Sequence, residues 1–106
     1  MKYVYFLVFA IFALLIGTSN VEADELGSNL GLAGSFNTAD FAYGVTISGN
    51  YAYVADNSNG LIIINIEDPT NSTFVGKYNT NGYAQDVSIS GNYAYVADGS
   101  EGLVII

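Results

Sequence analysis

The sequence predicts an all-β protein built from antiparallel four-stranded blades of a β-propeller, of which about two are present. Three observations predict this fold: a long internal repeat, turn residues at regular intervals, and strands that are apolar on both faces. No helical periodicity follows residue 16.

The internal repeat is the strongest of these signals. Leu32–Ile64 aligns without gaps on Phe74–Ile106, a spacing of 42 residues. The segments Val45–Asp56 and Val87–Asp98 differ at a single position, where Thr46 is replaced by Ser88. A period of about 40–45 residues is typical of four-stranded propeller blades.

Four strands fit each period. Gly49-Asn50 predicts a two-residue hairpin turn, because Gly and Asn accept the positive φ angles of type I′ and II′ turns. Pro69 predicts the turn before the fourth strand. In the first complete repeat the predicted strands are Tyr43–Ser48, Tyr51–Asp56, Gly60–Ile66 and Thr73–Asn79.

The third predicted strand is apolar on both faces. Leu61 and Ile63 point to one side, and Ile62 and Ile64 point to the other. A half-exposed antiparallel strand would alternate apolar with polar residues. We therefore expect both faces of the sheet to be covered by neighbouring sheets. A β-sandwich, with one face of each sheet open to water, is the alternative, and the repeat period favours the propeller.

Leu30–Phe36 aligns with Ser72–Tyr78, so it is predicted to be a fourth-type strand that precedes any first-type strand. We expect these 106 residues to be the start of a longer propeller, whose last blade this strand would complete. Two blades alone leave broad apolar faces and unpaired edges. The isolated fragment is therefore expected to be unstable or to self-associate.

The amino terminus has the layout of an export signal. Lys2 is followed by an apolar run of 14 residues, Tyr3–Ile16, and a polar stretch that ends at Ala23. The run is shorter than the roughly 20 residues that cross a bilayer as a helix, so no stable membrane span is expected after cleavage. The predicted organisation is a helical signal peptide (1–23), a linker (24–31) and propeller repeats (32–106), with a secreted or cell-surface location.

The composition excludes several classes of function. The chain has no Cys and no His, which removes disulfides, thiolate metal sites and the commonest general base. Ten acidic residues stand against two basic ones, giving a net charge of −8. A surface that binds nucleic acid or phosphate is therefore not expected.

Asp56 and Asp98 head equivalent polar loops, and their alternating oxygen side chains suggest a Ca²⁺ site. The spacing does not match an EF-hand loop, and Asp also caps tight turns through its own backbone, which is the favoured interpretation. No other cofactor or metal is expected. Asn71-Ser72-Thr73 is a candidate glycosylation site in a predicted turn.

No catalytic residues are predicted. Asp40 and Asp86 lie near first strands but at positions that are not equivalent, and neither has a second acid at a spacing that would make a glycosidase pair. Four tyrosines recur at repeat positions, so packing between blades is favoured over a carbohydrate groove for them. They are Tyr51, Tyr53, Tyr93 and Tyr95.

The repeat resembles the LVIVD repeat of secreted and cell-surface β-propeller proteins. Gly60–Ile66 stands where the name-giving segment lies, with Asn65 in place of its more usual Asp, and Asp68-Pro69 is similar to the family's Asn-Pro turn. The repeat also resembles the archaeal surface-layer propeller repeat. Both resemblances imply the same fold and compartment, and neither supplies catalytic residues.

The expected function is that of an exported, non-enzymatic propeller for surface structure, adhesion or protein interaction, with an extracellular protein or carbohydrate as partner. The alternative is the amino-terminal part of an exported propeller enzyme, such as a lyase, a glycosidase or a quinone-dependent dehydrogenase. Its active site would lie in a central channel lined by further blades.

We predict that the mature chain begins at Asp24, because Val21 and Ala23 offer the modest and small residues that a signal peptidase reads. Amino-terminal sequencing of material recovered from the culture medium or cell surface measures this. Exported protein that still begins at Met1 would contradict the prediction.

Overall fold

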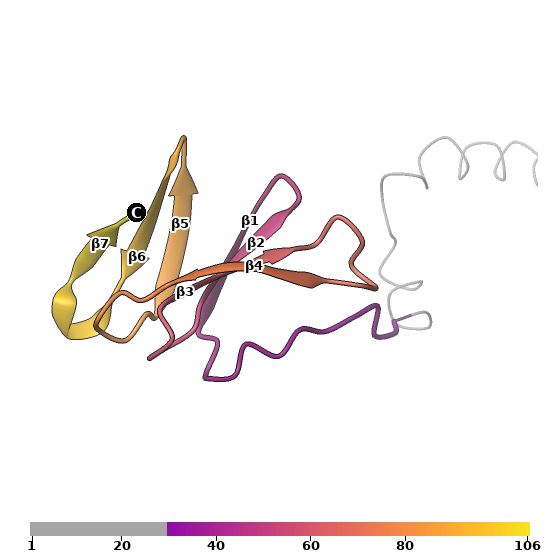
Figure 1. Ribbon diagram of the computed structural model, residues 1–106, viewed down its shortest axis with the longest axis horizontal. Coiled ribbons are helices and arrows are strands. Elements are labelled where there is room, and N and C mark those ends of the chain that lie inside the picture. Colours follow the sequence, from indigo (N-terminus) through magenta and orange to yellow (C-terminus); the bar gives the residue numbers. More distant parts are fainter. Residues whose placement is uncertain (1–29) are drawn as a thin grey trace, which may run out of the picture. The chain divides into compact units, whose positions relative to one another are not determined.

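The computed structural model describes residues 30–106 and is all-β, as predicted. The predicted signal peptide (1–23) and most of the linker (24–31) lie outside the described residues. All strands belong to one compact unit, Ala33–Ile106 (Figure 1). They are β1 (Gly44–Ser48), β2 (Tyr51–Ala55), β3 (Leu61–Asn65), β4 (Thr73–Tyr78), β5 (Asp86–Ser90), β6 (Tyr93–Ala97) and β7 (Leu103–Ile105).

The first sheet is a four-stranded antiparallel meander in the order β1-β2-β3-β4, which confirms the predicted unit. Gly49 has a φ of 57° whereas Asn50 has no positive φ, the signature of a type II′ hairpin turn. At the Pro69 turn, Asp68 accepts hydrogen bonds from the amide and hydroxyl of Thr70. Local turn chemistry therefore sets the strand order.

The second sheet repeats the first three strands in the order β5-β6-β7. A short 3₁₀ turn, η1 (Gly99–Glu101), replaces the loop that joins β2 to β3. No helix among residues 30–106 is both long and apolar enough to cross a membrane.

The strand register assigns each side chain to one of two faces, because directly opposite partners point to the same side. We call the face that carries Leu61 in the first sheet, and Leu103 in the second, the tail face; the opposite one is the head face. The first tail face holds Gly44, Thr46, Tyr53, Ala55, Leu61 and Ile63. The first head face holds Val45, Ile47, Ala52, Val54, Ile62 and Ile64. The second head face holds Val87, Ile89, Ala94, Val96 and Val104.

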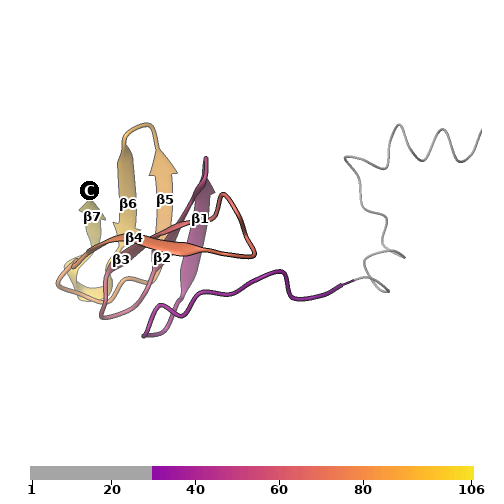
Figure 2. The same cartoon turned by 45° about the vertical axis from the view of Figure 1, so that its right-hand side comes forward.

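The tail face of the first sheet packs on the head face of the second, with β1 beside β5 (Figure 2). One buried cluster joins them, made of Ala55, Leu61, Ala84, Val87, Ala94 and Val96. The Thr46 hydroxyl donates to the Val87 carbonyl at 2.7 Å. A Cβ at position 44 would lie 2.8 Å from an Asp86 carboxyl oxygen, so Gly44 permits this close approach.

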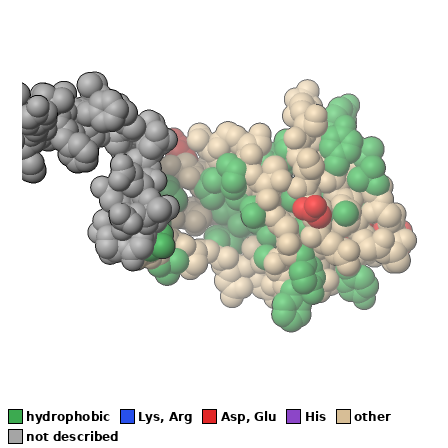
Figure 3. Space-filling model, turned by 180° about the vertical axis from the view of Figure 1, so that it is seen from behind, with side chains coloured by type: hydrophobic (Ala, Val, Ile, Leu, Met, Phe, Trp, Pro, Cys, Tyr) green, Lys and Arg blue, Asp and Glu red, His purple; other side chains and the backbone are tan. Residues whose placement is uncertain are grey.

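The head face of the first sheet holds a second cluster, Ala52, Val54, Ile62 and Ile64, against which Phe36 and Ile66 pack. The central strands β2 and β3 are therefore covered on both faces. The predicted neighbouring sheet lies on the tail face, where the packing is consistent with neighbouring propeller blades, whereas Phe36 and Ile66 pack on the head face instead of a sheet. Apolar side chains on the outer strands stay exposed to solvent. Figure 3 shows hydrophobic side chains exposed at several places on one face of the molecule.

The prediction that Leu30–Phe36 forms a strand is wrong for the structure as described. The segment has no strand assignment and forms no ladder with any described strand. Leu30 and Leu32 are largely exposed, and Phe36 instead packs on the head face of the first sheet. A strand requires a partner edge, and none lies along this segment.

We predict that Gly60→Ala destabilises the fold far more than Gly49→Ala. Both glycines have positive φ, 78° and 57°, so each substitution costs about 1–2 kcal/mol in backbone strain. At Gly60 a Cβ would also lie 2.2 Å from the Tyr78 carbonyl oxygen, whereas nothing lies within 4 Å at Gly49. We expect the clash to add at least about 2 kcal/mol to the loss in unfolding free energy.

Urea unfolding of both variants at one protein concentration, followed by circular dichroism, measures the difference. Equal losses for the two variants would contradict the proposed contact.

Candidate binding site at the rim of the sheets

Each repeat buries an aspartate at the end of its second strand. Asp56 and Asp98 are both 0% exposed. A buried carboxylate needs hydrogen-bond donors, since its hydration is lost. Thr38 and Thr80, each 18 residues earlier, donate their hydroxyls to Asp56 and Asp98 respectively. These bonds tie the segment before the first strand to the end of the second strand.

A different donor engages the second carboxyl oxygen in each repeat. The Asn59 side-chain amide donates to Asp56 at 2.8 Å, and the Gly82 backbone amide donates to Asp98 at 2.9 Å. A Cβ at position 82 would lie 2.3 Å from the Asp98 carbonyl oxygen, so the close approach at Gly82 leaves no room for a side chain. Both oxygens of each carboxylate are therefore engaged by protein donors.

The favoured interpretation, in which each aspartate caps a tight turn through its own backbone, does not describe these bonds. The donors are threonine hydroxyls, the Asn59 side chain and the Gly82 amide, and the Asp98 side chain makes no capping bond to η1. A cation would have to displace the hydroxyl and amide donors to reach either carboxylate. Among residues 30–106, no three acidic side chains gather where they could hold a metal ion. The Ca²⁺ hypothesis for Asp56 and Asp98 stays a prediction.

Asp40 organises the loop between β2 and β3. It accepts hydrogen bonds from the Ser58 hydroxyl, from the Ser58 backbone amide at 3.1 Å and from the Asn57 side-chain amide at 3.3 Å. The Ser58 hydroxyl, followed by the backbone amide of Phe41, lowers the pKa of Asp40 below its ordinary 3.8. Asp86, in contrast, is exposed and accepts from the adjacent amide of Val87. The structure thus gives these two acids separate structural roles.

A pocket of about 360 Å³ opens beside this loop, lined by Tyr43, Asn57, Tyr83 and Gln85. We call these four residues the rim pocket. Asn57 and Ala84 exchange backbone hydrogen bonds of 3.0 and 2.9 Å, which join the loop of the first sheet to the segment before β5. Because Asp40 also holds the Asn57 amide, the polar wall of the pocket is fixed from two sides.

The aromatic side chains here are unusually open. Tyr43 and Tyr83 are 60% and 56% exposed. The ring of Phe41 stacks beside Tyr43, with centroids 6.3 Å apart and an interplanar angle of 28°. Exposed rings next to amide side chains offer a stacking surface and neutral hydrogen-bonding groups together.

The tyrosines singled out from the sequence lie elsewhere. Tyr53 packs against the cluster between the sheets, as expected, whereas Tyr51 and Tyr93 are exposed at the hairpin ends. None of the four lines the rim pocket. Phe41 and Tyr83 share one repeat position outside the strands, which is the signal that could have identified this aromatic surface.

Asn71 is exposed in the turn before β4, where its backbone amide donates to the Asp68 carbonyl at 3.0 Å. Its side chain is therefore accessible to a modifying enzyme. Glycosylation of Asn71 stays a prediction.

The comparisons with known proteins agree with the repeat. The family model described as the LVIVD repeat matches residues 41–80 and again residues 81–106. The two matches together cover more than half of the chain. No curated protein and no solved structure matches it.

We predict that Ser58→Ala raises the pKa of Asp40 toward 3.8, because the hydroxyl is the largest cause of its lowering. Carboxyl-detected NMR titration measures this. A pKa lowered by folding stabilises the fold at pH values above the unfolded pKa, and this contribution is lost as the pH falls through the folded value. Thr70→Ala is the matched control, since Thr70 lowers the pKa of Asp68 instead. An unchanged Asp40 pKa in Ser58→Ala would contradict the assignment.

Proposed function

The chain belongs to the LVIVD-repeat family, and from this premise we propose that it is an exported, non-enzymatic propeller-type repeat protein that mediates adhesion at the cell surface. Export is supported by the apolar run Tyr3–Ile16 between Lys2 and the small residue Ala23. The acidic balance suits a solvated extracellular surface.

The observation that carries the adhesive role is the rim pocket. Its tyrosine rings can stack on the apolar face of a sugar, while Asn57 and Gln85 can exchange hydrogen bonds with hydroxyl groups. The pocket offers no cation, and Lys77 of the adjacent sheet donates to Asn59. We therefore propose a neutral carbohydrate as the ligand.

Binding fits the chemistry of the site better than catalysis does. Asp40 and Asp56, the carboxylates beside the pocket, accept hydrogen bonds from neighbouring hydroxyl and amide groups. The lowered pKa of Asp40 keeps it ionised at neutral pH, so it cannot act there as a general acid. These hydrogen bonds hold the loop in one arrangement, which favours recognition by a preformed surface.

We predict that Tyr83→Ala weakens binding to a neutral polysaccharide by about tenfold, because one stacking ring is lost. Native gel electrophoresis through soluble glucan, mannan and galactan measures the retardation. Tyr51→Ala is the matched control, since Tyr51 lies at the hairpin end of β2, whereas Asn57 follows the opposite end.

Retardation by none of the three polysaccharides would contradict the carbohydrate ligand. So would equal weakening by both substitutions. Specific retention by extracellular proteins alone would keep the adhesive role and replace the ligand.

A further inference from the structure

Lys77 is the only basic residue among residues 30–106, and its hydrogen-bond partner is neutral. It lies in β4, and its ammonium group donates to the side-chain carbonyl oxygen of Asn59 at 3.1 Å. A carboxylate would attract an ammonium group more strongly than a neutral amide does, and this chain carries a net charge of −8. The structure instead holds an amine against a carboxamide, and these two groups can condense to a new amide.

A buried carboxyl group contacts the other end of the same carboxamide. The side-chain nitrogen of Asn59, Nδ2, donates to Asp56 at 2.8 Å, and Asp56 is 0% exposed. Lys77, Asn59 and Asp56 therefore form one continuous chain of hydrogen bonds. The amine lies on the carbonyl side of the carboxamide, and the carboxyl group touches the nitrogen that a condensation would release.

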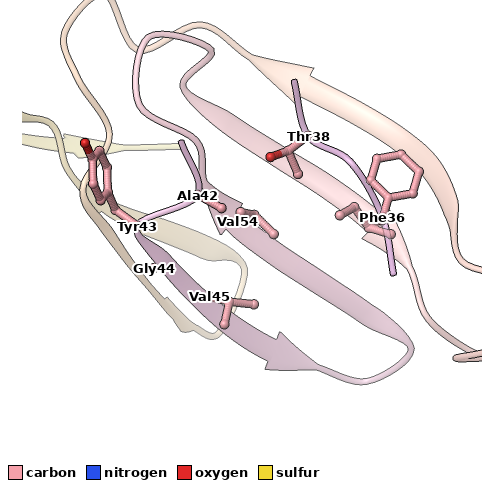
Figure 4. Close-up of a pocket in the computed structure, with 8 residues that line it drawn as sticks. Phe36, Thr38, Ala42, Tyr43, Gly44, Val45 and Val54 are labelled. Carbon is pink, nitrogen blue, oxygen red and sulfur yellow. The ribbon is translucent and has the colours of Figure 1, made fainter. Parts of the chain in front are cut away.

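The segment before β1 fixes the orientation of this carboxamide. Thr38 donates its hydroxyl to Asp56, and its backbone carbonyl accepts the Asn59 side-chain amide at 3.3 Å. Thr38 lies beside Phe36 over the first sheet, where both line a pocket of about 310 Å³ (Figure 4). Because the two contacts on this side are acceptors, the Asn59 nitrogen must face them and its oxygen must face Lys77.

We propose that Lys77 and Asn59 form an intramolecular amide cross-link, with Asp56 as the proton carrier. The inference goes beyond the adhesive role and does not depend on the ligand of the rim pocket. The neutral Lys77 amine attacks Cγ of Asn59, which forms the Nζ–Cγ bond. The surplus proton on Nζ moves to the carboxamide oxygen that the amine already contacts.

Release of ammonia completes the reaction. Asp56 in its protonated form gives a proton to Nδ2 of Asn59, the Cγ–Nδ2 bond breaks and ammonia leaves. The proton on the carboxamide oxygen then returns to Asp56, which is unchanged overall. Counted from the lysine ammonium, the products are the new amide and one ammonium ion, so atoms and charge balance. The step requires no oxidant, reductant or further reactant.

Proximity supplies the driving geometry. Nζ of Lys77 lies 3.1 Å from an oxygen that is bonded directly to Cγ of Asn59, so a small movement brings it to the carbon. Holding two reacting groups in this way is equivalent to an effective concentration on the order of 10⁵ M or more. An amide that is inert toward free amines can therefore react slowly here.

The arrangement is present in one repeat only. The residue 42 positions after Asn59 is Glu101, which has no side-chain nitrogen to release, and Asp98 accepts from the Gly82 backbone amide instead. In the first repeat the bond would join the loop after β2 to β4, on the far side of β3. Closing the segment 59–77 covalently restricts the unfolded chain, as a disulfide does, and so stabilises the first sheet.

Mass spectrometry of the denatured protein tests the inference. The chain is expressed with its full 106-residue sequence and its amino terminus is sequenced, so that its expected mass is known. After prolonged incubation at neutral pH, most of the protein is expected to be lighter by one ammonia molecule. Lys77→Arg is the matched control, since it keeps the charge at an exposed position and is expected to have its full mass. A full mass for the unmodified chain would overturn the inference.

A second readout separates the cross-link from backbone cyclisation. Asn59 precedes Gly60, and attack by the Gly60 amide would also release ammonia, although that amide donates to the Asn57 carbonyl at 3.2 Å. Trypsin is expected to leave the lighter chain uncut after Lys77, because Nζ is acylated, and to cut Lys77→Arg at that position. Loss of ammonia that persists in Lys77→Arg, or cleavage of the lighter chain after Lys77, would overturn the cross-link.

The role of Asp56 is tested by Asp56→Asn, which is expected to slow formation of the bond by at least about 100-fold. Asp98→Asn is the matched control, because Asp98 is equally buried and accepts a threonine hydroxyl but contacts no carboxamide. It is expected to form the bond at the unmodified rate. Equal rates in the unmodified chain and in Asp56→Asn, or equal losses in the two variants, would overturn the assignment of Asp56 as the proton carrier.

Discussion

The structure depends on one constraint, which is that β3 is apolar on both of its faces. Leu61 faces the second sheet and Ile62 faces the opposite side, and both are almost completely buried. Exposing either face would leave large aliphatic side chains in water. Apolar groups must therefore cover each side. The second sheet covers the tail face, where the small residues Gly44, Ala55 and Ala84 allow the backbones to come close, and Phe36 and Ile66 pack on the head face. Stacking of sheets follows from the composition of this strand.

Buried aspartates connect this core to the loops. Asp56 and Asp98 lie just past the last residue of β2 and β6, where the backbone leaves the sheet and the turn is held by backbone hydrogen bonds. Their burial is tolerated because a threonine and an amide donate to each of them. The same bonds hold the loop that presents Asn57 next to Ala84. The rim pocket is thus held by hydrogen bonds that form where β2 ends.

Most of the fold could be predicted from the sequence because its signals are local. The alternating and continuous apolar runs and Gly49 placed the strands to within about two residues. Features that depend on distant partners could not be predicted. The hydrogen bond between Thr38 and Asp56 and the bridge between Asn57 and Ala84 exist only once the sheets are stacked. Segment 30–36 has a strand-like sequence but no edge to pair with, so its local signal was insufficient.

Because the two repeats are nearly identical, the positions that serve packing can be distinguished from those that we propose for recognition. Leu61 and Leu103 are the same residue at the same repeat position, yet one is buried and the other is exposed, so the neighbour and not the side chain decides burial. The recognition that we propose, in contrast, would use positions where the repeats differ. Tyr43 and Gln85 occupy one repeat position and both line the rim pocket, while the counterpart of Asn57 is a glycine. Identical residues build an interface that every repeat can form with the next. Differing residues make the rim of this pair of sheets chemically distinct, and that difference would allow the proposed ligand to be bound at this one place.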